Sequence, residues 1–307
     1  MSGAALAAPH VSARRAEALG NRLPPLLVAA ERVAATVAQG VHGRRRVGQG
    51  DSFWQFRPFL AGDPASRIDW RQSARSDRAP HTKYFVRETE WEAAQTVVLW
   101  RDGAASMQWR SRHAPTAKIE RAGLLTLALA SLLLRGGERV RLLAPAARIA
   151  SGRGGLERLA EELGRLPEGE GLPPDATLPR HARVVLIGDL LGPLADIQAA
   201  IGRLAAVPVS GHVLQVLDPA EALLPYSGRI RFEGLRHGLH TLIPRVEEVR
   251  VAYAERLTEQ QAGLAAICAA AGFGFSTHRT DHPPEAALLA LYTALAPQAG
   301  PGRAGGR

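Results

Sequence analysis

The order of apolar segments from residue 96 onward constrains the fold more than any other feature of this sequence. Short apolar runs alternate with longer segments that have a helical period. We expect strands at residues 96–100, 139–143, 184–187, 213–217 and 273–278. We expect helices at residues 116–134, 156–166, 194–206, 247–271 and 285–295. Strands that alternate with helices predict an α/β domain, in which a mainly parallel sheet has helices on both faces.

The rest of the chain predicts a smaller N-terminal region and two flexible ends. Residues 23–39 have the pattern of a helix, with prolines at its start and Gly40 after its end. Residues 81–90 alternate as a strand does. We predict a flexible N-terminus at residues 1–22 and a flexible tail at residues 297–307. Between them we predict a helix with a β-rich region at residues 23–92 and the α/β domain at residues 93–296. A β-hairpin is expected as an insertion in that domain, at residues 225–243.

The charge of the chain does not predict a nucleic-acid-binding protein. The net charge is +9, and all basic residues except Lys83 and Lys118 are arginine. The only tight basic run is Arg44-Arg45-Arg46, whereas a nucleic-acid face concentrates basic residues and interleaves them with aromatic ones. We therefore expect no nucleic acid among the partners.

Three further features predict a cytoplasmic location. The single cysteine, Cys268, excludes a disulfide within the chain and fits a reducing compartment. The most apolar segment, residues 124–134, is shorter than the roughly 20 residues of a membrane span. The N-terminus lacks the apolar stretch of a secretory signal.

Acidic residues follow two of the predicted strands, where open α/β sheets bind their ligands. Asp102 follows the first strand and Asp189 follows the third. With Ser106 they offer oxygen ligands for Mg²⁺ or another divalent cation, bound weakly, and Ser151 is a less favoured fourth ligand. The alternative is that each aspartate caps a helix or closes a turn, and both interpretations stay open. We find no Ser/His/Asp or Cys/His set and predict no catalytic residues.

A second group of residues combines both signs of charge around a tryptophan. An internal ion-pair network is one interpretation of this segment, and a docking surface is the other. Its members are Gly62, Asp63, Arg67, Asp69, Trp70, Arg71 and Arg75.

Several segments together resemble one bacterial family, the domain of unknown function 58 (DUF58). They are GRRRVGQGDSFWQFRPFLAGDPASRIDWRQSAR, YFVRETEWEAAQTVVLW, DGAASM and LQVLDPAEALLPYSGRIRFEGL. The resemblance extends from about Leu23 to Leu295, and the G-D-x-x-x-R-I-D-W signature is its most specific part. It implies a von Willebrand factor A-like, Rossmann-like α/β domain with a small N-terminal β-rich region.

The resemblance also implies a metal loop and a partner. In such domains an aspartate and two serines of the first loop, a threonine of the second and an aspartate of the third hold Mg²⁺. Asp102, Ser106 and Asp189 match this pattern, whereas Ala104 stands where the first serine is expected. The implied function is a non-enzymatic interaction module, an adaptor or co-chaperone that acts with a MoxR-type AAA ATPase on a client protein. The alternative is a metal-dependent hydrolase that uses Asp102 and Asp189.

Overall fold

A computed structural model of the chain consists of two compact units, one formed by residues 43–94 and the other by residues 1–42 and 95–307. The structure describes residues 26–38, 53–59, 68–74, 84–89, 95–152, 154–167, 169, 171–234 and 240–295. The ends that we predicted to be flexible, 1–22 and 297–307, lie outside the described residues.

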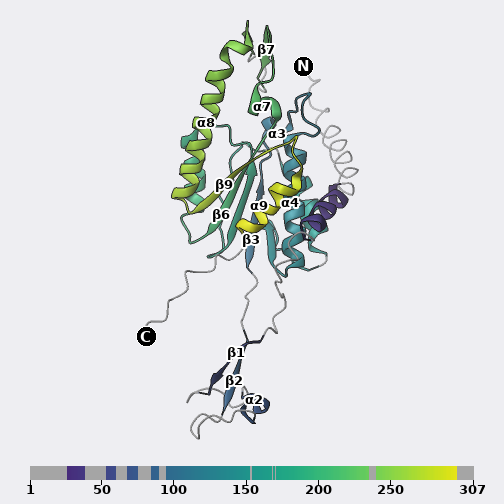
Figure 1. Cartoon of the computed structure of the whole chain (residues 1–307), viewed down its shortest axis with the longest axis vertical. Coiled ribbons are helices and arrows are strands. Elements are labelled where there is room, and N and C mark those ends of the chain that lie inside the picture. Colours follow the sequence, from purple (N-terminus) through teal and green to yellow (C-terminus); the bar gives the residue numbers. More distant parts are fainter. Residues whose placement is uncertain are drawn as a thin grey trace, which may run out of the picture. The chain divides into compact units, whose positions relative to one another are not determined.

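The larger unit is built on a sheet of five strands (Figure 1). The strands are β3 (Thr96–Arg101), β4 (Arg139–Leu142), β5 (Arg183–Gly188), β6 (Ser210–Leu217) and β9 (Phe273–Arg279). Their order across the sheet is β4-β3-β5-β6-β9, and every neighbouring pair is parallel. The predicted parallel α/β fold is confirmed, and all five strands therefore have their carboxyl ends at the same edge.

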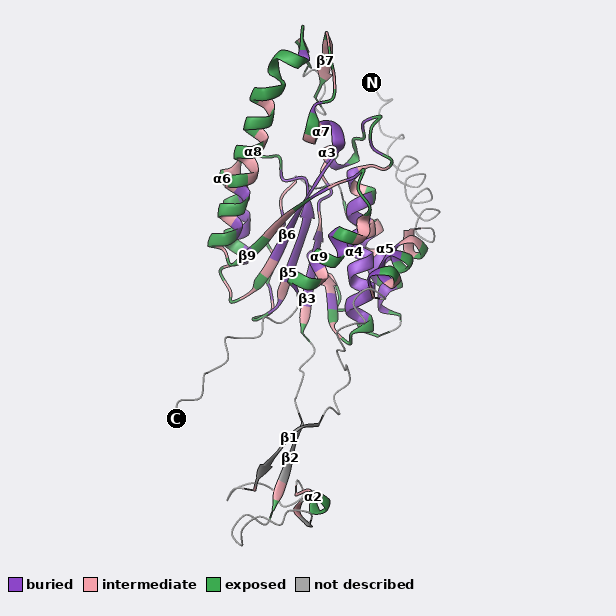
Figure 2. Ribbon diagram, viewed as in Figure 1, coloured by how far each residue is buried: buried purple, intermediate pink, exposed green. Residues whose placement is uncertain are grey.

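Helices cover both faces of this sheet, as the alternating pattern predicted (Figures 1 and 2). The core of one face contains residues of α4 (Lys118–Arg135), α5 (Gly155–Arg165) and α9 (Pro284–Ala294). The core of the other face contains residues of α6 (Leu194–Leu204) and α8 (Val246–Ala270). Successive strand residues contribute to opposite cores, because side chains alternate between the two faces of a strand. In β3, Val97 and Leu99 pack on the first face, and Val98 and Trp100 on the second.

A helix over residues 26–38 belongs to the larger unit, which differs from the predicted boundary at residue 92. The predicted boundaries place this helix with the β-rich region that follows it. Ala30, Val33, Ala34 and Val37 are buried in the same core as α4. Their spacing places them on one face of the helix, and the α/β domain provides the apolar surface that buries this face.

The smaller unit contains a two-stranded antiparallel sheet and a short helix. β1 (Phe53–Pro58) pairs with β2 (Phe85–Thr89), and α2 (Trp70–Ala74) lies between them in the chain. β2 lies within the strand that we predicted over residues 81–90.

The loops that follow β3 and β6 contain two short helices and a β-hairpin. α3 (Ala105–Gln108) follows β3, and α7 (Pro219–Leu223) follows β6. β7 (Ile230–Glu233) and β8 (His240–Ile243) then form an antiparallel hairpin within the segment where a hairpin was predicted.

Candidate functional site

Three aspartates lie at the carboxyl edge of the sheet, each directly after a strand. Asp102 follows β3, Asp189 follows β5 and Asp218 follows β6. The exposed fractions of these residues are 0%, 4% and 0%. Buried carboxylates need partners, because burial without them costs several kcal/mol. The partners of each carboxylate therefore decide what this edge can bind.

Asp102 closes the turn that leads into α3. Its Oδ1 accepts a hydrogen bond from the backbone N–H of Ala104 at 2.8 Å, so the turn role that stayed open is present here. Its Oδ2 is buried. This oxygen faces the backbone of β5, since a Cβ built on Gly188 would lie 2.9 Å from it. Burial raises the pKa of Asp102 from an ordinary 3.8 to about 6, and the nearby Asp189 carboxylate adds to the rise.

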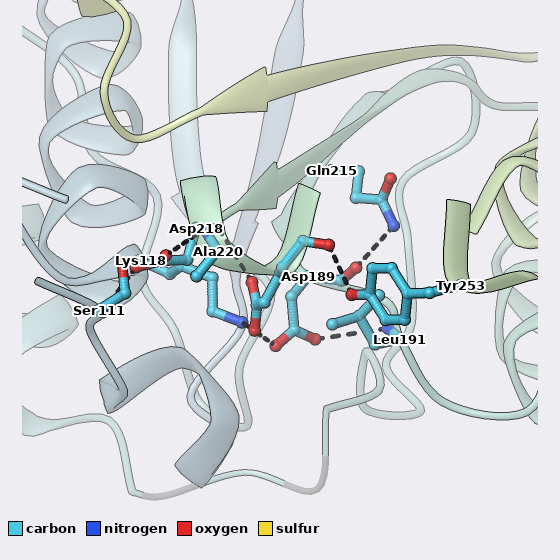
Figure 3. A network of polar contacts seen from close by, with 9 residues as sticks. Ser111, Lys118, Asp189, Leu191, Gln215, Asp218, Ala220 and Tyr253 are labelled. Atoms are coloured by element: carbon cyan, nitrogen blue, oxygen red, sulfur yellow. Dashed lines mark hydrogen bonds and ion pairs between the residues drawn. The ribbon is translucent and has the colours of Figure 1, made fainter. Parts of the chain in front are cut away.

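Lys118, the first residue of α4, places its ammonium group between two acidic side chains. Its Nζ lies 2.9 Å from Oδ2 of Asp189 and also contacts Oε1 of Glu221 on α7. Figure 3 shows the Lys118 side chain directed at the Asp189 carboxylate. The Lys118 side chain is 0% exposed. Burial raises the pKa of Glu221, and the Lys118 ammonium opposes that rise.

Hydrogen bonds connect this ion cluster to the neighbouring loops (Figure 3). Asp218 accepts from the backbone N–H of Ser111 at 2.9 Å, in the connection between α3 and α4, and from that of Ala220 at 2.8 Å. Glu221 accepts from the backbone N–H of Asp218 at 2.9 Å. Gln215 of β6 donates to the backbone oxygen of Asp189 at 2.9 Å. The loops after β3, β5 and β6 are thus held together through buried side chains.

Lys118, Asp218 and Glu221 were not among the site residues predicted from the sequence. One signal could have singled out the lysine, which is one of only two in a chain that otherwise uses arginine. The partners of Lys118 lie 71 and 103 residues away along the chain. No local pattern links positions at such distances.

The structure brings only part of the predicted metal set together. Asp102 and Asp189 share the carboxyl edge, and Ser106 is half-buried in α3. Ser151 does not lie at the carboxyl edge, because its neighbour Ala150 forms a β-bridge with Val140, near the start of β4. Val140 pairs with Val97, five residues before Asp102, and at about 3.3 Å per residue this places Ser151 roughly 16 Å towards the amino ends of the strands.

The residues at this edge do not fit Mg²⁺ in their present arrangement. Oδ2 of Asp189 is paired with an ammonium, and Oδ1 of Asp102 is hydrogen-bonded to a backbone amide. Within the described residues, no group of three or more His, Cys, Asp and Glu side chains could hold a metal ion. The alternative of a hydrolase would need such a third ligand. The divalent-cation site stays a prediction that a metal titration can test.

Only part of the tryptophan-centred signature segment is described. Gly62, Asp63, Arg67 and Arg75 lie outside the described residues. The backbone N–H of Asp69 donates to the carbonyl of Phe85 at 2.8 Å, and this contact joins the start of α2 to β2. Trp70 is 63% exposed and packs edge-to-face against Tyr84, with ring centroids 5.6 Å apart. Arg71 is exposed on α2.

A second buried cation of α4 holds the loop after β9. Arg121 lies one turn beyond Lys118 and donates to the backbone oxygens of Thr280 and His282, the former at 3.0 Å. Its Nη1 also lies 3.1 Å from Nε2 of His278. Burial, with the Arg121 charge, lowers the pKa of His278 from 6.5 to about 4. The two cations together attach the first turn of α4 to loops after β5, β6 and β9.

Two leucines at this edge have left-handed backbone conformations. Leu190, next to Asp189, has a φ of 47°, and Leu224, at the end of α7, has a φ of 45°. Such conformations are uncommon for residues other than glycine and persist where the surroundings hold them. Gln260 donates to the carbonyl of Leu190 at 3.3 Å, and Arg250 to that of Leu224 at 3.2 Å. Both donors belong to α8, so this helix helps to hold the loops that contain Leu190 and Leu224 in place.

Three large apolar side chains are exposed on the same loops. Trp109, which follows α3, is 38% exposed, Leu191 after β5 is 40% exposed, and Leu223 in α7 is 50% exposed. Each lies within a few residues of the buried network, at Ser111, Asp189 and Glu221. Single exposed leucines are common, but several at one edge of a domain are typical of interaction sites.

Comparison with known proteins gives one family. The model of the family described as protein of unknown function DUF58 matches residues 55–263. None of the curated proteins matches the chain. Within the described residues, no helix has the length and hydropathy of a membrane span.

Two solved structures are similar to the chain at low identity. One is an aerotolerance-related membrane protein from Bacteroides fragilis, 17% identical, with 66% of this chain and 98% of that chain covered and a TM-score of 0.35. The other is the conserved hypothetical protein BatB from Bacteroides thetaiotaomicron, also 17% identical, with 66% and 97% covered and a TM-score of 0.31.

Proposed function

Because the chain belongs to the DUF58 family, whose function is unknown, we propose from its site that it is a non-enzymatic protein-interaction module. The proposed docking surface is the carboxyl edge of the sheet, in a domain that we take to be von Willebrand factor A-like. One observation carries the proposal. A buried polar network joins three loops, and each of these loops exposes one large apolar side chain, namely Trp109, Leu191 or Leu223.

The network supports docking because it orders the loops before a partner arrives. Association is weakened when loops must be ordered on binding, and preorganised loops avoid much of that loss. Lys118 joins the loop after β5 to α7, and the Ser111–Asp218 hydrogen bond joins α7 to the loop that carries Trp109. The resulting edge combines fixed loops with apolar anchors, and one of them, Trp109, is of a residue type that often dominates the binding energy of interfaces.

The family resemblance supplies the partner in this proposal. The partner is a MoxR-type AAA ATPase, and the module acts with it as an adaptor or co-chaperone in the assembly or activation of a client protein. This assignment predicts a cytoplasmic protein and requires no catalytic residue of its own.

The test measures binding to the purified MoxR-type ATPase of the same genome, with ADP and with ATP, by sedimentation. The variant Trp109→Ala/Leu191→Ser/Leu223→Ser should weaken binding by about tenfold or more, because it removes three anchors. Its melting temperature should change little, since the side chains are substantially exposed. Ile149→Ser is the matched control, because Ile149 is 49% exposed and lies towards the opposite ends of the strands.

The proposal is wrong if the triple variant binds the ATPase as tightly as the native chain does. Equal weakening by Ile149→Ser would also contradict it, since the effect would then not be specific to the carboxyl edge. If the native chain forms no complex with the ATPase in either nucleotide state, the partner assignment fails.

A further inference from the structure

The ion cluster at the carboxyl edge contains a positive charge where the metal loop of a von Willebrand factor A-like domain would hold a divalent cation. We infer that the Lys118 ammonium replaces that cation, so that the loops after β3, β5 and β6 are held together without metal. The inference concerns how this edge is stabilised and does not depend on the proposed docking function.

The position of the ammonium is the first argument. Asp189 matches the third-loop aspartate of the metal pattern, and its Oδ2 lies 2.9 Å from Nζ of Lys118. A divalent ion bound to that oxygen would be in close contact with a like charge in a buried, weakly screened environment. Either the ammonium or the metal can occupy this place, and the chain carries the ammonium covalently.

The loop after β3 provides the second argument, because its residues have other contacts than those of a metal-binding loop. Oδ1 of Asp102 is hydrogen-bonded to the amide of Ala104, and Oδ2 is buried against Gly188. Ala104 has no hydroxyl, and a Cβ built on Gly171 would lie 3.6 Å from its Cβ. The backbone N–H of Gly169 donates to the carbonyl of Gly103 at 3.1 Å, so the chain after α5 lies against this loop.

Glu221 is the third argument. It lies outside the metal pattern, on α7, and contributes a second carboxylate to Lys118. Glu221 itself is fixed by the backbone N–H of Asp218 at 2.9 Å. A buried ammonium with two carboxylates at separate loops connects those loops as a bound cation would.

The experiment compares melting temperatures in four buffers, which contain EDTA, MgCl₂, MnCl₂ or NaCl of matched ionic strength. The metal concentration is about 10 mM, which is far above the dissociation constant of a useful site. The native chain should melt within about 1 °C in all four buffers. Lys118→Met should lower the melting temperature by roughly 10 °C, because it leaves two buried carboxylates without their cation. Mg²⁺ or Mn²⁺, but not NaCl, should restore about half of this loss.

Arg121→Met is the matched control. Arg121 is a buried cation on the same face of α4, but its partners are backbone carbonyls and a histidine. Its loss should also lower the melting temperature, and no metal should restore it. Restoration in both variants would mean a non-specific effect of metal and would overturn the inference.

Two other results would overturn it. One is a metal-dependent rise in the native chain that Asp102→Ala abolishes, because a divalent ion would then bind beside the lysine. The other is a folded Lys118→Met variant that no metal stabilises. If that variant does not fold, the test uses the native chain alone. The measurement is then the electron paramagnetic resonance of Mn²⁺ added to the native chain. An undiminished free-ion signal supports replacement, and a bound-ion signal overturns it.

Discussion

At the scale of single residues, the first turn of α4 concentrates an unusual amount of buried charge. Lys118 is 0% exposed and Arg121 is 7% exposed. Isolated charges of this kind are strongly unfavourable in a protein interior, so each must be matched by oxygen or nitrogen acceptors. Lys118 has two carboxylates, whereas Arg121 has carbonyls and the imidazole of His278.

The neutral state of His278 makes the stability of the fold depend on pH. Its pKa is about 4 in the folded chain, first because of burial and then because of Arg121, against 6.5 for an ordinary histidine. Between these values the unfolded chain binds the proton and the folded chain does not, so stability falls as the pH decreases from 6.5 to 4. The shift corresponds to about 3 kcal/mol.

We expect urea unfolding at pH 7 and at pH 4.5 to reveal this contribution. His278→Gln should lose less stability between the two pH values than the native chain, by about 2 kcal/mol, because glutamine does not titrate. His240→Gln, at an exposed position in β8, should keep the native pH dependence. An unchanged pH dependence in His278→Gln would show that the imidazole is not held neutral.

At the scale of elements, close backbone approach between strands sets a packing limit that side-chain patterns do not reveal. Gly211 in β6 lies opposite Phe273 of β9. A Cβ built on it would lie 2.6 Å from the backbone oxygen of Val184 in β5 and 2.8 Å from the Phe273 ring. The backbone oxygen belongs to a strand that is itself buried, so it cannot move aside easily.

Gly211→Ala should therefore destabilise the larger unit by about 1–3 kcal/mol, as overpacked cores do. The measurement is the free energy of unfolding in urea. Gly202→Ala in α6 is the control, because nothing lies within 4 Å of a Cβ built there. That substitution should stabilise by up to about 1 kcal/mol through helix propensity. A neutral Gly211→Ala would mean that the sheet relaxes at β6.

At the scale of the whole molecule, the chain leaves the larger unit after the helix at 26–38 and returns to it at residue 95. The buried residues of both described cores come from the segments before residue 43 and after residue 94. The larger unit therefore contains the complete set of described strands and helices that its sheet needs. The smaller unit has its own strand pair and helix.

Replacement of residues 43–94 by a Gly/Ser linker of about 15 residues should leave the larger unit folded. We expect a cooperative melt within about 5 °C of that of the native chain, because no described core residue is removed. Circular dichroism during heating measures this. A non-cooperative melt would show that the smaller unit is needed for the fold of the larger one.

The strands and helices of the α/β domain could be predicted from local sequence patterns. Residue periods of 2 and 3.6 are local properties, and burial of the sheet on both faces makes the strands apolar throughout. The predicted strands and helices from residue 96 onward agree with the observed ones to within two residues at nearly every end. The convergence of Asp102 and Asp189 was also predictable, because parallel strands align their carboxyl ends.

The partners of these residues depend on the three-dimensional arrangement of the elements and could not be predicted from local patterns. Lys118 meets Asp189 and Glu221 because the strand order β3-β5-β6 brings together loops that are 71 and 103 residues away from it along the chain. The bridge between Ala150 and Val140 turns the chain back, and this removes Ser151 from the edge where it was predicted. The helix at 26–38 joins the larger unit because its apolar face is buried beside α4. Periodicity is local, whereas such pairings depend on strand order and on the surface that each face finds to cover it.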